Sequence, residues 1–240
     1  MFLPLIAVAF SALFAVPGVA SPGASAEAPT ADVLPQEGLD PFMTIARVRY
    51  GGGGDWYAGP SSLPNLLAEI RKRTGLPVAS DPVTVQLTDP DLRDYPFLFL
   101  TGHGDFRFTE EEAEGLRSFL LSGGFLHADD CYGLDEHFRR EIARVFPDKE
   151  LVPIPNEHEI YNTFYSLPEG LPKIHEHDGL PPQGFGIFHD GRMIVYYTYE
   201  SDIHDGWEDA EVHGNPPELR EEAFRMGVNI FYYALSQVAR

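Results

Sequence analysis

From residue 41 onward, the chain alternates short apolar runs with stretches of helical periodicity. The apolar runs are rich in β-branched and aromatic residues and are bounded by Gly, Pro, Asn or Asp, a pattern typical of strands. We expect strands within 41–50, 83–87, 95–101 and 125–129, and a short one at 151–154. The run at 95–101 is almost wholly apolar, which indicates a strand buried on both faces.

Four segments place apolar residues at the spacing of an α-helix. These residues fall within 63–70, 110–124, 138–146 and 219–234. Ser61 and Ser62 are candidate N-terminal caps of the first helix. Before the second helix, Thr109 and Glu112 have the spacing of a capping box, and Gly123 is expected to end that helix.

The order of these elements predicts the fold class. Strands and helices alternate, which favours a parallel sheet covered by helices. Asp190-Gly191 separates two apolar runs, at 185–189 and 192–199, and this dipeptide favours a two-residue hairpin. We therefore expect an α/β fold: a flavodoxin-like, doubly wound, mostly parallel sheet with helices on both faces and an antiparallel hairpin at one edge.

The beginning of the chain has a different character. Residues 2–16 are almost wholly apolar, too short a stretch for a comfortable membrane span, and small residues follow at 24–26. We expect a signal peptide at 1–26, although it lacks a basic start; the alternative is an uncleaved anchor. Residues 27–40 are rich in Pro, Ala and Ser and predict a disordered lead-in. Residues 41–240 then form a single domain, exported to the periplasm or the medium, with no later transmembrane segment.

Charge and cysteine content narrow the function classes. The chain carries 37 acidic and 17 basic residues, for a formal net charge of -20. Nucleic acid is not expected as a partner, because neutralising phosphates requires a basic surface. One cysteine in 240 residues excludes an internal disulfide.

Three loops that follow predicted strands carry unusual polar residues: GGGGDWYAGPSS, TGHGDF and DDCYG. Ligands of doubly wound sheets bind outside the carboxyl ends of the strands, so we expect the loops to form one crevice for a small polar ligand. The glycines match neither the phosphate-binding loop nor the dinucleotide fingerprint. Aromatics folded onto the sheet edge are the structural alternative. The candidate ligand-binding residues are Asp55, Trp56, Tyr57, His103, Asp105, Asp129, Asp130, Cys131 and Tyr132.

Cys131 lies where a nucleophile would stand, between a strand and a helix. A nucleophile elbow needs small residues two positions before and after the nucleophile; Gly133 fits this pattern and Asp129 does not. Adjacent carboxylates also raise the pKa of a thiol. We expect Cys131 to be a small residue at a strand end rather than a nucleophile, unless a histidine approaches it in space.

Metal binding is a further alternative. One set of candidate ligands is His103, His175, Glu176, His177 and Asp178. A later run adds Asp202, His204, Asp205, Glu208, Asp209 and His213. These N and O donors suit zinc or another divalent ion, but their spacing matches neither the HExxH motif nor the EF-hand. A solvated loop or a hydrogen-bonded network has the same composition, so no cofactor is certain.

Several separated segments carry a family resemblance. They include TGHGDF, DDCYG, KIHEHDG, SDIHDGWED and RMGVNIFYYAL. Together they resemble the bacterial domain-of-unknown-function family 4159 over about residues 41–235. The resemblance implies a class I glutamine amidotransferase-like fold, no established activity, and an association with envelope assemblies.

The Cys-His-Glu triad of amidotransferase-like domains does not carry over. Only Cys131 lies near the nucleophile position, and no His-x-Glu follows it; the nearest pairs are His158-Glu159 and His175-Glu176. We expect an exported protein that binds a small polar ligand or an envelope partner without cysteine catalysis. The alternatives are a divalent-metal-dependent hydrolase, with Asp129 and Asp130 among its ligands or acid-base groups, and a structural module of an envelope complex.

Overall fold

A computed structural model describes residues 43–238, and every structural statement below concerns those residues. The predicted signal peptide at 1–26 and the lead-in at 27–40 lie outside the described residues, and both stay predictions.

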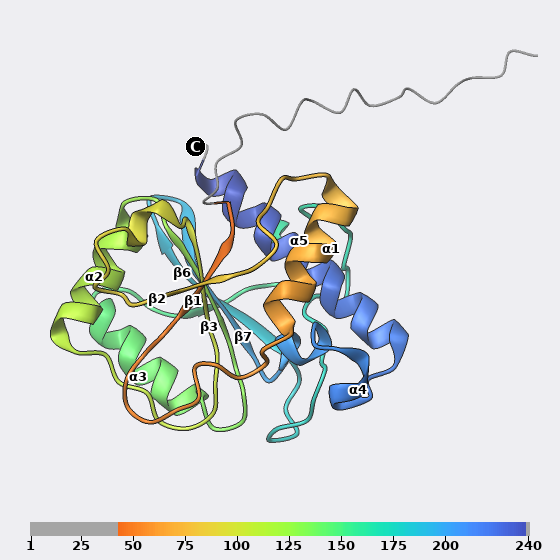
Figure 1. The fold of residues 1–240 in the computed structure, drawn as a ribbon. Helices are drawn as coiled ribbons and strands as arrows, with labels where there is room; N and C mark the ends of the chain where they lie inside the picture. The colour runs from red at the N-terminus through yellow and green to blue at the C-terminus, as the bar shows by residue number, and fades with distance from the viewer. Residues whose placement is uncertain (1–42, 239–240) are drawn as a thin grey trace, which may run out of the picture. The chain divides into compact units, whose positions relative to one another are not determined.

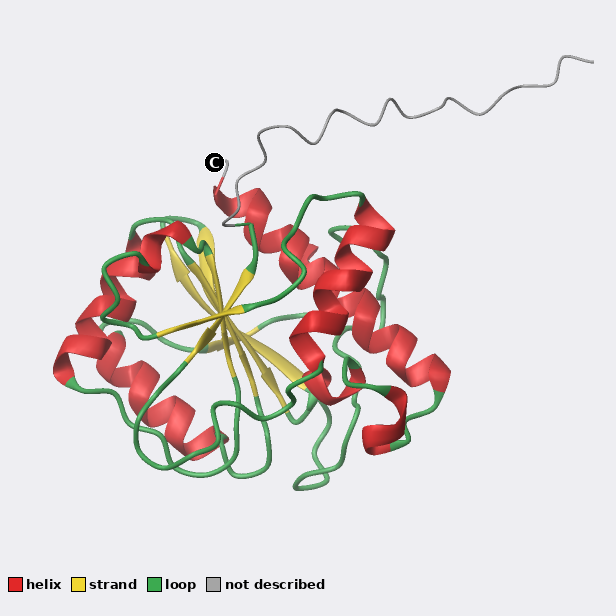
Figure 2. Cartoon of the chain, in the orientation of Figure 1, coloured by secondary structure: helices red, strands yellow, loops and turns green. Residues whose placement is uncertain are grey.

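Seven strands form one sheet (Figures 1 and 2). They are β1 (Ile45–Val48), β2 (Val83–Val85), β3 (Phe97–Leu100), β4 (Phe125–Asp129), β5 (Val152–Pro153), β6 (Gln183–His189) and β7 (Arg192–Tyr199). Their order is β2-β1-β3-β4-β7-β6-β5. The pairings from β2 to β7 are parallel, and β6 is antiparallel to both of its neighbours. The predicted α/β class is confirmed.

The predicted hairpin turns at Asp190 and Gly191, both with positive φ as a type I′ turn requires. Its second strand, β7, lies inside the sheet and continues the parallel series beside β4, while β6 and β5 extend the antiparallel edge. Asp129 at the end of β4 pairs in register with Thr198 of β7. The carboxyl ends of these two strands are therefore neighbours.

Helices cover both faces of the sheet. Those of three or more turns are α1 (Ser62–Thr74), α2 (Glu110–Leu121), α3 (Asp135–Val145) and α5 (Pro217–Val238). The short segments are α4 (Ala210–His213) and the 3-10 turns η1 (Leu92–Asp94), η2 (Glu159–Tyr161) and η3 (Ile203–Gly206). Figure 1 shows α1 and α5 on one face and α2 and α3 on the other.

Burial on both faces explains the continuous apolar run of β3. Phe97 and Phe99 belong to the core under α1 and α5, whereas Leu98 and Leu100 belong to the core under α2 and α3. Successive side chains of a strand point to opposite faces, so a strand covered on both faces needs apolar residues at every position.

Of the two predicted helix caps, the one before α2 is present and the one before α1 lacks its side-chain hydrogen bond. Thr109 and Glu112 form the predicted capping box, with both reciprocal bonds present. Ser61 occupies the predicted N-cap position of α1, but its side chain makes no capping hydrogen bond. Ser62 lies inside the helix and donates to the Gly59 carbonyl, while Ser61 donates to Glu208 and accepts from the Asp209 amide. The two hydroxyls tie α1 to other segments instead.

Within residues 43–238, no helix combines the length and the apolar character needed to cross a bilayer.

Candidate functional site

Histidine, aspartate and cysteine side chains gather at the carboxyl ends of β4 and β7. Asp129 is the last residue of β4, and Cys131 follows two positions later. Strand β7 leads into η3, which carries His204. Since β4 and β7 are adjacent parallel strands, residues 73 positions apart meet at one edge of the sheet.

Asp129 is fully buried and has a partner for both oxygens. Its carboxylate accepts the Thr198 hydroxyl and the backbone amides of Ile203 and His204. It also accepts a bond from Nδ1 of His204, at 2.7 Å. This last bond places the proton on Nδ1 and turns Nε2 of His204 away from the carboxylate.

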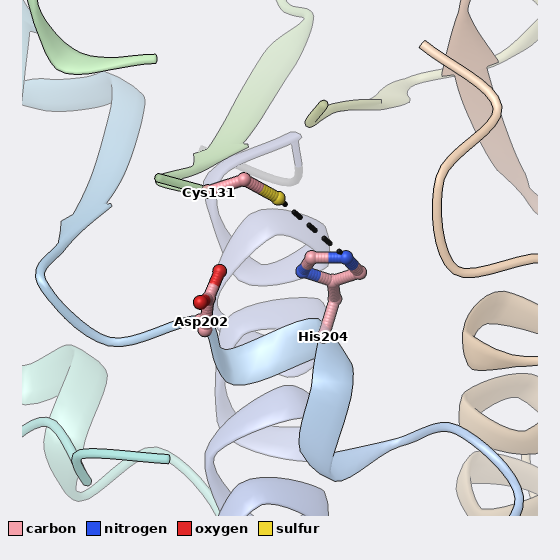
Figure 3. A group of neighbouring side chains, drawn as sticks. All are labelled: Cys131, Asp202 and His204. Atoms are coloured by element: carbon pink, nitrogen blue, oxygen red, sulfur yellow. Dashed lines mark hydrogen bonds between the residues drawn. The ribbon is translucent and has the colours of Figure 1, made fainter. Parts of the chain in front are cut away.

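Nε2 of His204 faces Cys131. The distance from Nε2 to Sγ is 3.8 Å, and the Thr101 hydroxyl lies 3.2 Å from the same sulfur. Asp202 brings a carboxylate beside the pair (Figure 3). One donor atom each from Cys131, Asp202 and His204 lies within 4.8 Å of the other two, and all three residues are buried. We call these three residues the buried cluster.

Burial raises the pKa of the Cys131 thiol, and His204 offsets this only in part. Burial alone would lower the pKa of His204, but Cys131 and Asp129 outweigh it and hold that pKa well above its ordinary value. Burial thus favours the neutral thiol of Cys131, while contact with Asp129 favours the protonated imidazole of His204. A thiol in this state is a poor nucleophile, because the thiolate is the reactive form.

Two features of the segments after β4 and β7 are unfavourable in free energy. Glu200 and Asp202 both have φ in the left-handed region, at 56° and 51°, which is unfavourable for residues other than glycine. Oδ1 of Asp202 and Oδ1 of Asp130 are buried without a hydrogen-bond partner in the protein. A buried carboxylate oxygen without a partner costs free energy unless a ligand or water supplies one.

A second group lies beside the first. Nδ1 of His175 is 2.7 Å from Oδ2 of Asp205, and Nε2 of His213 is 3.3 Å from Oδ1 of the same residue. Donor atoms of these three residues also lie within 4.8 Å of one another. We call them the outer cluster, because the side chains of His175 and His213 are 30% and 28% exposed. Oδ1 of Asp205 is 3.2 Å from Nε2 of His204, so the two clusters touch.

The loops after β1 and β3 pair with each other, while the predicted crevice for a ligand stays a prediction. Asp55 accepts a bond from the backbone amide of His103 and contacts Nδ1 of its ring at 3.1 Å. The Gly54 amide donates to the Asp105 carbonyl. Asp55 and His103 belong to neither cluster.

The loop after β1 nevertheless reaches the site through its glycine. A Cβ built on Gly59 would lie 2.7 Å from Cδ2 of the His204 ring. Trp56 of this loop lies beside the Arg49 guanidinium, 5.8 Å from its ring centre, and Tyr57 is 63% exposed. The backbone at Gly59 therefore lies against the His204 ring.

The predicted metal ligands separate in the structure. His175 belongs to the outer cluster. Nε2 of His177 bonds Oδ2 of Asp202, and its Nδ1 lies 3.6 Å from Oδ2 of Asp130. His177 therefore orients the Asp202 carboxylate and is not itself a member of the buried cluster. Glu176 is exposed and pairs with Lys173.

The remaining candidates take structural or peripheral positions. The Asp178 amide donates to the buried Glu200 carboxylate. Asp105 accepts a bond from Arg140 on α3. Tyr132 is 64% exposed, and its ring meets the edge of the His177 ring.

The pairing of Cys131 with His204 was not predicted from sequence. The later acidic run was identified as a source of donors, but nothing in its spacing connects it to the loop after β4. The missing information is the placement of β7 beside β4, which depends on the whole sheet.

The comparisons agree with this picture of an uncharacterised domain. No curated protein matches the chain. The family model described as Domain of unknown function (DUF4159) matches residues 44–235, a range that includes both clusters. The chain therefore belongs to the DUF4159 family.

Proposed function

We propose that the buried cluster binds a divalent metal ion and that the protein is a metal-dependent hydrolase. The observation that carries this proposal is the convergence of a sulfur, an imidazole nitrogen and a carboxylate oxygen within 4.8 Å. A tetrahedral zinc ion separates its sulfur and nitrogen ligands by about 3.5 Å, given typical Zn–S and Zn–N bond lengths. The observed separation of 3.8 Å needs only a small adjustment.

The surroundings of the cluster also suit a metal centre. A ligating histidine usually donates its other N–H to a carboxylate, and Asp129 accepts that bond from His204. Oδ1 of Asp202 lacks a partner within the protein and is free to coordinate. A bound cation would favour the ionised thiol and the neutral imidazole, because these are the forms that coordinate a metal.

Three protein ligands leave a fourth position for water or substrate, as in catalytic zinc sites. An ion held there supplies Lewis acidity and lowers the pKa of a bound water. The protein contributes the orientation of the ligands. Asp129 fixes the His204 ring, Thr101 contacts the Cys131 sulfur, and His177 holds the Asp202 carboxylate.

A second candidate uses the same residues as a thiol relay. Sγ of Cys131, Nε2 and Nδ1 of His204, and Oδ2 of Asp129 form a continuous chain of contacts of 3.8 and 2.7 Å. This continuous chain of contacts is the observation that favours the candidate. The 1% exposure of Cys131 and its raised thiol pKa oppose it, so we place it second.

Cobalt substitution tests the metal proposal. Protein stripped with a chelator and loaded with Co²⁺ is expected to show thiolate-to-cobalt charge-transfer absorption in the near ultraviolet. Cys131→Ser and His204→Gln should abolish this band. The matched control is His103→Gln, because His103 bonds Asp55 outside both clusters; the band should persist in that variant.

The contrary outcome is equally clear. A His204→Gln protein that binds cobalt as wild type does, with the thiolate band intact, would remove the buried cluster as a metal centre. Metal-independent hydrolysis of a chromogenic ester that is abolished by iodoacetamide and by Cys131→Ser would favour the thiol relay.

A further inference from the structure

We infer that the outer cluster of His175, Asp205 and His213 binds a second divalent ion, next to the first. The inference concerns a separate set of ligands, and it rests on the proposed function only for the idea that the two ions act together.

The donor set suits a transition metal. Two imidazoles approach opposite oxygens of one carboxylate, at 2.7 and 3.3 Å. The His175 and His213 rings have centroids 4.8 Å apart and lie at 63° to each other, so their nitrogens converge without stacking. Two histidines and a carboxylate with open positions are a common ligand set for zinc, manganese and iron.

The three donors come from three segments, and the backbone of each is fixed. The amides of Ile174 and His175 both donate to the Ser201 carbonyl. Asp205 lies in η3, where its amide donates to the Asp202 carbonyl. His213 is the last residue of α4.

Helix α4 is itself held in place. It ends at Gly214, whose φ of 65° turns the chain away from the cluster. At its other end, Asp209 accepts a bond from Asn65 of α1, and the Asp209 amide donates to Ser61. Ligands positioned by rigid neighbours lose little conformational entropy when an ion binds.

Glu208 adds a carboxylate oxygen beside the three donors of the outer cluster. Its Oε2 lies 2.7 Å from Nε2 of His213, and its side chain is only 6% exposed. A simple surface ion pair would leave such groups in water. Here both carboxylates contact Nε2 of His213 and are largely buried, since the Asp205 side chain is only 14% exposed. Concentrating two carboxylates in this way is costly unless positive charge is present.

Asp205 connects the two clusters. The same Oδ1 that contacts His213 lies 3.2 Å from Nε2 of His204, a donor of the buried cluster. One carboxylate thus touches donors of both sets. Two-metal hydrolytic sites hold their ions about 3.5–4 Å apart and stabilise the attacking and leaving oxygens together. The contact through Asp205 places a donor of the outer cluster beside a donor of the buried cluster, as a pair of neighbouring ions would require.

Metal stoichiometry tests the inference. After loading with Zn²⁺ and exhaustive dialysis, elemental analysis of the full chain is expected to give two ions in wild type. His175→Gln and His213→Gln should each retain one ion and weaken binding of the other by more than about tenfold, since each removes a ligand. The matched control is His189→Gln, a comparably exposed histidine at the end of β6, which should retain two ions.

The cobalt band separates the two sites. In His213→Gln the thiolate band should persist, because that band reports the buried ion alone. The inference is overturned if the cobalt band is present and the zinc stoichiometry is the same in wild type, His175→Gln and His213→Gln. That outcome leaves the proposed function standing. A protein without the band whose single ion is lost in His213→Gln supports the inference and overturns the proposed function. Both histidines are partly exposed, so these substitutions should not prevent folding.

Discussion

At the scale of single residues, Asp129 decides what His204 can do. Asp129 accepts a hydrogen bond from Nδ1 of His204. Nε2 of the ring then faces Cys131 and Asp205. A carboxylate pointing elsewhere would let the ring rotate or change tautomer, and the donors of the two clusters would no longer converge.

His127 gives a prediction at the same scale. It lies in the middle of β4, 1% exposed, and burial lowers its pKa to about 4. In the unfolded chain a histidine titrates near 6.5, so between pH 6.5 and 4 only the unfolded state binds this proton. The free energy of unfolding should therefore fall as pH falls through this window, by up to about 3 kcal/mol.

Urea unfolding at a series of pH values measures this effect. His127→Gln should be less sensitive to acid between pH 6.5 and 4 than wild type, whatever its stability at pH 7. His189→Gln, which changes a histidine that is 31% exposed, should follow the wild-type curve. Parallel curves for wild type and His127→Gln would show that His127 does not resist protonation.

Cys131 shows why the site escaped prediction at this scale. The sequence offers only its neighbours, two aspartates and a glycine, which argue against a reactive thiol. The residue that changes its environment is His204, 73 positions away. The expectation that Cys131 is not a nucleophile stays a prediction. Its contacts with the donors of the proposed metal site could not be predicted from local spacing.

At the scale of elements, the close approach of the loop after β1 to the turn η3 depends on a single glycine, Gly59. Gly59 has φ of 63°, and a Cβ there would meet the His204 ring. Gly59→Ala should therefore destabilise the protein by about 1 kcal/mol or more through backbone strain, and should also displace His204. Metal binding by the buried cluster should weaken as a result.

Gly75→Ala is the matched control for Gly59→Ala. Gly75 ends α1 with φ of 72°, and a Cβ there would meet nothing within 4 Å. This substitution carries the same type of backbone strain without touching the site. Thermal unfolding and cobalt titration of the two variants separate strain from displacement. Equal cobalt affinity in both would show that Gly59 does not position His204.

The elements themselves were largely predictable. Strand β4 has the bounds that its apolar run indicated, and α2 begins at the capping box and ends before Gly123. These features depend on residues within a few positions of one another, which periodicity and cap chemistry describe. The side chain of Ser61 makes no capping hydrogen bond to α1, because it bonds Glu208 and Asp209, residues far along the chain.

At the scale of the whole molecule, the net charge of -20 predicts a response to salt. Repulsion among like charges destabilises the compact state. Raising KCl from about 0.01 to about 1 M shortens the screening length from about 30 to about 3 Å, so folding should be favoured. With a chelator present to prevent metal binding, a gain of about 1 kcal/mol would raise the melting temperature by about 2–4 °C. An unchanged or lower melting temperature would contradict this expectation.

Strand β7 reaches its place beside β4 late in synthesis, because the paired residues Asp129 and Thr198 are 69 positions apart. A ribosome adding roughly 5–20 residues per second takes about 3–14 s to make that stretch. Throughout this interval β4 is an edge strand whose backbone groups are free to pair with another chain. The nascent protein is thus most exposed to aggregation between the emergence of β4 and that of β7. The arrival of β7 closes this edge and brings η3, with His204, to the end of β4.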